Sequence, residues 1–309
     1  MSLARVREIA ARVSNWGRWG ADDERGTVNF ITPDVLRKAA ACVRRGAVFS
    51  LALPLGSEGP QFGQAGRVNP VHVMTATNGP MSADPEGAHY ADDFITMPLQ
   101  CATQWDSLAH VHYGRQLYNG HSIANVTPAG ASRNGIDKIA AAGIVSRGVL
   151  LDVARARGVE RLAPGELVTP ADLDAAEAAE RVKVESGDVL LLRTGHMRVF
   201  THDGDRVTYM KVSPGIGVDC VEWLHAREIA ALASDTNLVE VYPPEVPGVM
   251  FPVHMLCIRD MGLTLGEMFD LEALAEDCAR DGVYECLLTA APLPVSGGVG
   301  SPINPLAVK

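Results

Sequence analysis

The spacing of apolar residues predicts helices and strands that are mixed along the whole chain. Residues 3–13 carry apolar side chains at helical intervals, and a second helix begins at Thr32-Pro33 and ends by Gly46. Further helices are predicted over 170–179, 218–227 and 271–280. Apolar runs bounded by turn residues predict strands over 48–53, 71–75, 94–99, 148–153, 189–195, 229–233 and 283–289. With no internal repeat or low-complexity linker, the pattern favours a single α/β domain over 1–309 with an N-terminal helical extension over 1–45.

Composition narrows the range of partners and compartments. The net charge of -10 argues against nucleic acid and anionic membrane surfaces as partners. The six cysteines are scattered without a Cys-x-x-Cys pair, which is typical of free thiols in a reducing compartment and favours the cytoplasm. The N-terminal residues are charged throughout, and no apolar stretch reaches the roughly 18 residues that span a bilayer, so we expect neither a signal peptide nor a membrane helix.

One short segment, 103–110, concentrates catalytic side-chain types. It places Asp106 and His110 four residues apart, beside Gln104 and Trp105. A carboxylate can hold a metal, and a histidine can bind one or move a proton near neutral pH. Two interpretations remain open from spacing alone, a capped polar turn and a functional site.

A second cluster pairs His254 with Glu267, each inside an apolar run where a lone ionisable group is unusual. His254 as a satisfied core histidine and Glu267 as a cap for the helix near Asp270 are the alternatives. Gln100, His112 and His121 lie close to the first cluster in the sequence. The chain has no Gly-x-Ser-x-Gly elbow and no phosphate-binding loop, and its C-terminal glycines do not match a dinucleotide fingerprint.

The run Gln100-x-Ala102-Thr103-Gln104-x-Asp106-x-Leu108-x-His110 resembles a known signature, His-x-Gly-Thr-His-x-Asp-x-Pro-x-His. That signature marks the metal-dependent cyclase-like hydrolases, the family of the kynurenine formamidases and isatin hydrolases. The resemblance continues through 189–195, 213–215, 221–224 and 234–236 to the His254 and Glu267 pair, and covers most of residues 45–290.

This resemblance implies a swivelling β/β/α cyclase-like fold with a β-barrel-like core, assembled as a homodimer or homotetramer. It implies a divalent metal, zinc or manganese, and hydrolysis of a C–N bond other than a peptide bond in an N-formyl or cyclic amide, a small-molecule substrate. Asp106, His254 and Glu267 match the metal ligands. His110 matches the general acid/base that acts on a metal-activated water, and Gln104 is placed to orient the water or the carbonyl.

The chain departs from the family pattern at two ligand positions, where Gln100 and Gln104 replace histidines. A single-metal site, a site that recruits His72, His110 or His112, and a metal-free relative are the three outcomes left open. A lactone hydrolase and a non-catalytic binding protein are the alternative functions. For a planar substrate, Trp105, Trp19 and Tyr113 are the candidate contacts, with Trp16 as a further candidate and core packing as the alternative for each.

Overall fold

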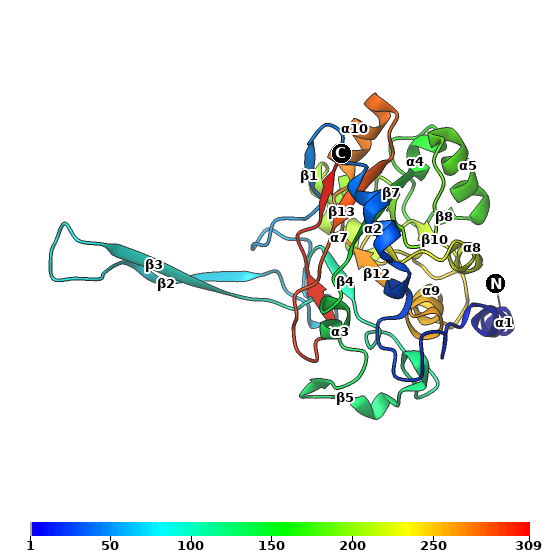
Figure 1. Cartoon of the computed structure of the whole chain (residues 1–309), viewed down its shortest axis with the longest axis horizontal. Helices are drawn as coiled ribbons and strands as arrows, with labels where there is room; N and C mark the ends of the chain where they lie inside the picture. The colour runs from blue at the N-terminus through cyan, green and yellow to red at the C-terminus, as the bar shows by residue number, and fades with distance from the viewer. Residues whose placement is uncertain (1) are drawn as a thin grey trace.

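A curled sheet of nine strands forms the centre of the computed structural model, which describes residues 2–309 (Figure 1). From one edge to the other, the strands are β1 (Val48–Ser50), β15 (Leu306–Val308), β13 (Glu285–Thr289), β7 (Val145–Asp152), β9 (Val189–Arg193), β11 (Ala231–Ser234), β12 (Thr264–Glu267), β4 (Gln104–Asp106) and β14 (Gly300–Pro302). This curled, mixed sheet confirms the predicted α/β class.

The middle of the sheet is parallel and its two flanks are antiparallel. Strands β7, β9, β11 and β12 run in one direction, whereas β4 pairs antiparallel with β12 and β14 pairs antiparallel with β4. In this register Gln104 lies opposite Glu267, and Asp106 lies opposite Gly300. Because side chains alternate along a strand, Gln104 and Asp106 share one face of β4 and Trp105 points to the other.

Two of the longer helices begin where the sequence places caps. In α2 (Pro33–Ala40) the side chain of Thr32 accepts a hydrogen bond from the backbone N–H of Val35, and in α5 (Pro170–Glu180) Thr169 and Asp172 form a capping box. The remaining α-helices are α1 (Leu3–Val13), α3 (Ile136–Ala140), α4 (Val153–Ala156), α6 (Met197–Thr201), α7 (Arg206–Lys211), α8 (Cys220–Ala226), α9 (Pro252–His254) and α10 (Glu272–Asp281). None of the helices among residues 2–309 combines the length and apolarity needed to cross a membrane.

A main hydrophobic core joins both ends of the chain. It includes Val6, Ile9 and Val13 from α1, Trp105 from β4 and Ala307 from β15. The indole of Trp105 packs against Phe269 and donates its N–H to the carbonyl of Ala290 at 2.7 Å. The predicted N-terminal extension therefore packs into the same core as the central sheet.

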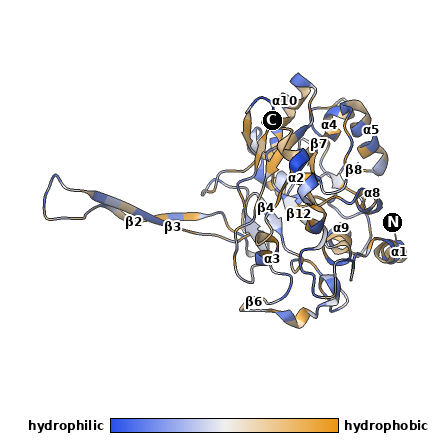
Figure 2. Ribbon diagram, viewed as in Figure 1, coloured by the Kyte–Doolittle hydropathy of each residue, from blue (hydrophilic) through white to orange (hydrophobic). Residues whose placement is uncertain are grey.

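A long β-hairpin, hereafter the arm, extends from the body of the protein (Figure 1). Its strands are β2 (Val71–Pro80) and β3 (His89–Thr96), which pair antiparallel. We predicted strands over 71–75 and 94–99 only, because the segment between them is rich in Gly, Pro and Asp, which are typical of turns. Figure 2 shows apolar and polar residues mixed along the arm, and its strand residues are almost all exposed.

The remaining strands are short pairs outside the main sheet. They are β5 (Val126–Thr127) with β6 (Gly130–Ala131), and β8 (Leu167–Val168) with β10 (Gly215–Ile216). Most predicted elements agree with the structure to within a few residues, although the helix after Thr32 ends at Ala40, well before Gly46.

Candidate active site

Two carboxylate side chains and one imidazole meet near one edge of the sheet, where β12 and β4 pair. Asp106 comes from β4, Glu267 from β12 and His254 from α9, and one ligand atom from each lies within 4.8 Å of the others. Nε2 of His254 is 3.2 Å from Oε1 of Glu267 and 3.9 Å from Oδ2 of Asp106. Among residues 2–309 this triad is the one group of His, Cys, Asp and Glu side chains that satisfies this geometry.

Burial and close charges shift the pKa values of two residues of the triad. Loss of hydration, followed by repulsion from Glu267, holds the pKa of the Asp106 carboxyl well above its usual range. For His254 burial opposes the charged form, but hydrogen bonds with Glu240 and Glu267 outweigh it and raise the pKa to about 10. Two carboxylates this close need either a proton on one of them or positive charge between them, and a protonated His254 or a metal ion can supply that charge.

Two buried oxygen atoms support the metal alternative. Oδ2 of Asp106 and Oε1 of Gln104 have no hydrogen-bond partner among residues 2–309. Nε2 of Gln104 donates to Oε2 of Glu267 at 2.8 Å and lies 3.4 Å from Oδ1 of Asp106. A half-turn of this amide exchanges its nitrogen and oxygen, which brings a neutral oxygen donor towards the triad. The residues present therefore fit a divalent cation with one imidazole nitrogen and several oxygen ligands.

A further carboxylate, Glu240, fixes the imidazole from behind. It is buried and accepts hydrogen bonds from the backbone N–H groups of Val253, at 3.2 Å, and His254, at 2.9 Å. It also pairs with Nδ1 of His254. Metal-binding histidines commonly use such a carboxylate to set the tautomer and the ring orientation. The other ring nitrogen, Nε2, consequently faces Asp106 and Glu267.

The backbone is irregular beside both His254 and its partner Glu240. Phe251 and Val239 adopt left-handed φ values of 55° and 58°, an uncommon state for any residue with a Cβ and a strained one for a β-branched residue. Immediately after His254, the chain forms a π-helix over Met255–Met261. Both features are typical of functional sites.

His110 occupies the position expected of an acid/base beside this triad. Its Nε2 is 3.7 Å from Oδ1 of Asp106, too long for a direct hydrogen bond. Burial, with smaller effects from the positive charges of His254 and Arg67, lowers its pKa to about 3. The ring is therefore neutral at pH 7.

A cavity of about 200 Å³ opens onto His110, His254 and Glu267. Its other walls include Gln61, Arg67 and Asn237, together with the apolar side chains of Met210, Leu238 and Phe251. It offers polar groups on an apolar lining, which is typical of a small-molecule site.

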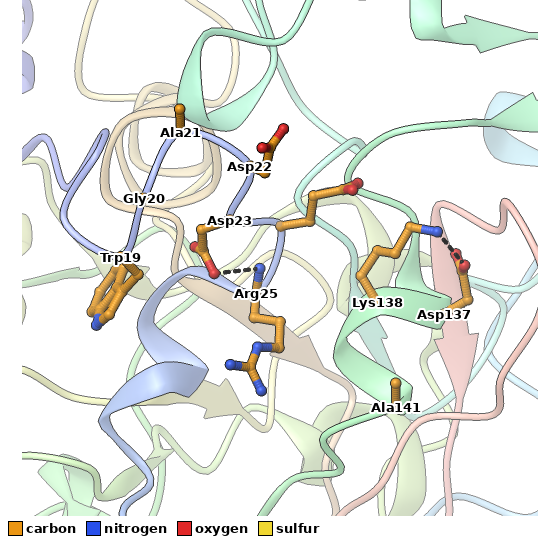
Figure 3. A pocket seen from close by; sticks show the side chains of 10 residues that line it. Trp19, Gly20, Ala21, Asp22, Asp23, Arg25, Asp137, Lys138 and Ala141 are labelled. Atoms are coloured by element: carbon orange, nitrogen blue, oxygen red, sulfur yellow. Dashed lines mark hydrogen bonds and ion pairs between the residues drawn. The ribbon is translucent and has the colours of Figure 1, made fainter.

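The structure places all three predicted aromatic contacts, Trp105, Tyr113 and Trp19, outside the cavity of the triad, so this prediction was wrong. Trp105 is fully buried on the opposite face of β4, where it packs in the core. Tyr113 donates to Oδ2 of Asp260 at 2.6 Å, and neither it nor Trp19 lines the cavity of the triad. Trp19 instead borders a separate surface hollow of about 700 Å³ with Asp22, Asp23 and Lys138 (Figure 3). The sequence shows that these residues are aromatic, but it does not show the direction in which the strand or loop points each side chain.

The remaining candidate histidines and Gln100 do not join the triad. His72 pairs with Asp93 on the arm at 2.7 Å, and His112 is exposed. Neither His112 nor His121 lines the cavity of the triad. The side chain of Gln100 packs against Gly300 on β14, and its buried Nε2 has no hydrogen-bond partner among residues 2–309, whereas Gln104 bonds Glu267 directly. Glu267 lies on β12 and does not cap the following helix.

Several residues of the site escaped the sequence analysis. Glu240, Arg67, Asn237 and Gln61 lie far from the signature along the chain. Glu240 carried a usable signal, because it is a lone acid between Val239 and Val241. The other three are ordinary polar residues in loops, for which the sequence offered none.

Comparisons with known proteins agree with this geometry. Residues 49–241 match the Cyclase family, described as "Putative cyclase". The isatin hydrolase of Roseibium aggregatum is 24% identical over 234 residues, covering 73% of this chain and 77% of that protein. A crystal structure described as a novel cyclase is 41% identical with a TM-score of 0.87, covering 96% of this chain and 100% of the other. Isatin hydrolase A from Ralstonia solanacearum shares the fold at 22% identity with a TM-score of 0.63, covering 89% of this chain and 97% of the other.

Because the family match extends over more than half of the sequence, the chain belongs to the Cyclase family. The resemblance drawn from the signature is thereby confirmed. The family match and the isatin hydrolase relative together support a hydrolase of the cyclase-like type.

Proposed function

We propose that this protein is a divalent-metal-dependent hydrolase that cleaves an amide C–N bond, in an N-formyl or cyclic amide. One observation carries the proposal. Asp106 is fully buried with one carboxylate oxygen unpartnered, inside a triad whose other members, His254 and Glu267, line a cavity. A buried carboxylate in this state calls for a cation. The isatin hydrolase relative supports a substrate with an amide-like bond.

The triad would hold the cation through Asp106, His254 and Glu267, with Gln104 as an additional oxygen donor. Zinc and manganese are the candidates, and the predominance of oxygen donors favours manganese, since each additional imidazole or thiolate would favour zinc. When bound, such an ion polarises a carbonyl and lowers the pKa of a coordinated water from about 15.7 towards about 7.

His110 would act as the general base and then as the general acid. Its ring borders the cavity, and its Nε2 lies 3.7 Å from Oδ1 of Asp106. From this position it would take a proton from water and return it to the leaving nitrogen. Gln104 would orient the carbonyl or the water through its amide. The apolar wall formed by Met210, Leu238 and Phe251 would exclude bulk water from the reacting groups.

The test is a screen of formamides, cyclic imides and lactones with protein loaded with Mn²⁺ or Zn²⁺. We expect turnover of an amide, and a decrease of about 10²–10⁴-fold in kcat in His110→Ala with bound metal retained. His202→Ala is the matched control, because His202 is exposed and outside the cavity, and should behave as wild type. Turnover of lactones alone would replace the proposed substrate class. Absence of turnover would leave a binding protein, and loss of metal in His110→Ala would make His110 a ligand.

The cysteines are free, and five of the six are buried, as expected in a reducing compartment. A cytoplasmic location is proposed on that ground.

A further inference from the structure

The cavity beside the triad contains a positive charge without a protein partner. Arg67 lines the cavity, half-buried, and no carboxylate among residues 2–309 lies within 4.0 Å of its guanidinium. The two most buried arginines differ in this respect. Arg147 pairs with Asp188 and Glu285, and Arg193 pairs with Asp152 and Glu272. An arginine left unpaired at a cavity wall is a ready-made binding group for an anion.

The positive charge of Arg67 acts on two residues of the site, Asp106 and His110. This charge is one of the smaller influences that lower the pKa of His110, and it opposes the larger rise that burial causes in the pKa of Asp106. The guanidinium and these two side chains therefore share one electrostatic environment. An anion held by Arg67 would therefore lie within the same small cavity as the triad.

Two buried carbonyl oxygens lie on residues of the same cavity. Asn237 is 4% exposed and Gln61 is 3% exposed. The amide nitrogen of Asn237 donates to the carbonyl of Met210 at 3.0 Å, and that of Gln61 donates to the carbonyl of Cys101 at 3.0 Å. Oδ1 of Asn237 and Oε1 of Gln61 have no donor among residues 2–309. Rotating either amide would set its oxygen against a carbonyl, so both oxygens are fixed as acceptors.

We propose that Arg67, Asn237 and Gln61 form a recognition site for an amide substrate that carries a carboxylate. Arg67 binds the carboxylate, and the two fixed oxygens accept a hydrogen bond from the substrate N–H. This deepens the proposed function and rests on it. The acceptors distinguish between substrate classes, since a lactone offers no ring N–H and would leave both oxygens unpaired. A neutral ring would likewise leave the guanidinium desolvated without a counter-charge.

Matched substrates test this directly on the metal-loaded full chain. N-formylanthranilate and formanilide share a formamide on a benzene ring and differ by one carboxylate. We expect wild type to favour the carboxylate substrate by about tenfold or more in kcat/KM, and Arg67→Gln to lose that preference mainly through KM. Arg44→Gln removes an equal charge from an exposed position outside the cavity and should retain the preference. Equal preference in wild type and Arg67→Gln would overturn the proposal.

Binding of a non-reacting probe separates this inference from the proposed function. Anthranilate carries a carboxylate and N–H groups, benzoate only the carboxylate, and calorimetry measures both without turnover. We expect Arg67→Gln to weaken both probes by about tenfold or more, and Asn237→Leu to weaken anthranilate more than benzoate. Unchanged affinities in Arg67→Gln would refute the recognition site even if amides are hydrolysed. Selective binding without hydrolysis would refute the proposed function and retain the site.

Discussion

Glu240 decides which nitrogen of His254 faces the carboxylates. Its two oxygens accept backbone N–H groups of Val253 and His254, and it pairs with Nδ1, so Nε2 is directed to Asp106 and Glu267. This arrangement depends on a negative charge behind the ring. A neutral amide would keep the shape but donate less electron density to the imidazole.

We therefore expect Glu240→Gln to weaken divalent-metal affinity by about 10–100-fold while the fold is retained. Competition with a chromophoric chelator measures the Kd for Mn²⁺ and Zn²⁺. Glu245→Gln is the control. Glu245 lies on the same connection between β11 and α9 as Glu240, and its carboxylate accepts a hydrogen bond from the backbone N–H of Val218 without touching the triad. An unchanged Kd in Glu240→Gln would show that Glu240 does not support the ligand.

Residue identity alone predicted part of this site. Asp106, His254 and Glu267 meet as expected, because an ionisable group in an apolar run must find a partner. The direction of Trp105 could not be derived, since the polar flanks of β4 concealed its strand alternation. Glu240 and Arg67 reach the cavity only through long-range folding, which no local pattern encodes.

At the scale of the secondary-structure elements, helix termini and strand registers position the residues of the site. The elements with full periodicity and caps, such as α1, α5 and β9, agree with the predictions. Strands β4 and β12 were missed because three or four residues with mixed polarity give no period-two signal. Their pairing nevertheless sets Gln104 opposite Glu267, and thus defines the site.

The capping box of α5 makes a testable contribution to stability. Asp172 accepts from the backbone N–H of Thr169 at 2.7 Å and pairs with Arg157 at 2.6 Å. Burial opposes the charged form of Asp172, but the hydrogen bonds with Arg157 and Thr169 outweigh it and lower its pKa to about 2. Because this lies below the roughly 3.9 of an unfolded chain, the stabilisation is complete above pH 4 and is lost as the pH falls towards 2.

Asp172→Asn should lower the free energy of unfolding by about 2 kcal/mol at pH 7, and by progressively less below pH 4. Urea unfolding monitored by circular dichroism at several pH values measures this difference. Asp34→Asn, at an exposed acid in the first turn of α2, should cost less than about 0.5 kcal/mol at any pH. A pH-independent loss in Asp172→Asn would assign the effect to packing.

At the scale of the whole molecule, the arm stands out because its strand residues are almost all exposed. Apolar side chains lie on both faces, with Val73 and Phe94, cross-strand partners, 42% and 50% exposed. An isolated two-stranded hairpin is at best marginally stable in water. Apolar exposure continues into the preceding loop at Phe62 and Val68. We propose that a second copy of the chain covers the arm, which gives the expected homo-oligomer a physical basis.

Light scattering on the purified protein tests this assembly. Wild type should have the mass of a dimer or tetramer, and the double variant Val73→Ser with Phe94→Ser should shift towards the monomer. Val159→Ser removes an exposed apolar side chain near α4 and should leave the mass unchanged. A monomeric wild type at micromolar concentration would contradict the proposal.

Metal content of the purified chain tests the central claim, that Asp106, His254 and Glu267 form a cation site despite glutamine at two ligand positions. Elemental analysis after dialysis against Mn²⁺ or Zn²⁺ should give about one ion per chain in wild type, and a large loss in His254→Ala. Less than about 0.2 ion per chain in wild type, without uptake of either metal, would contradict the account.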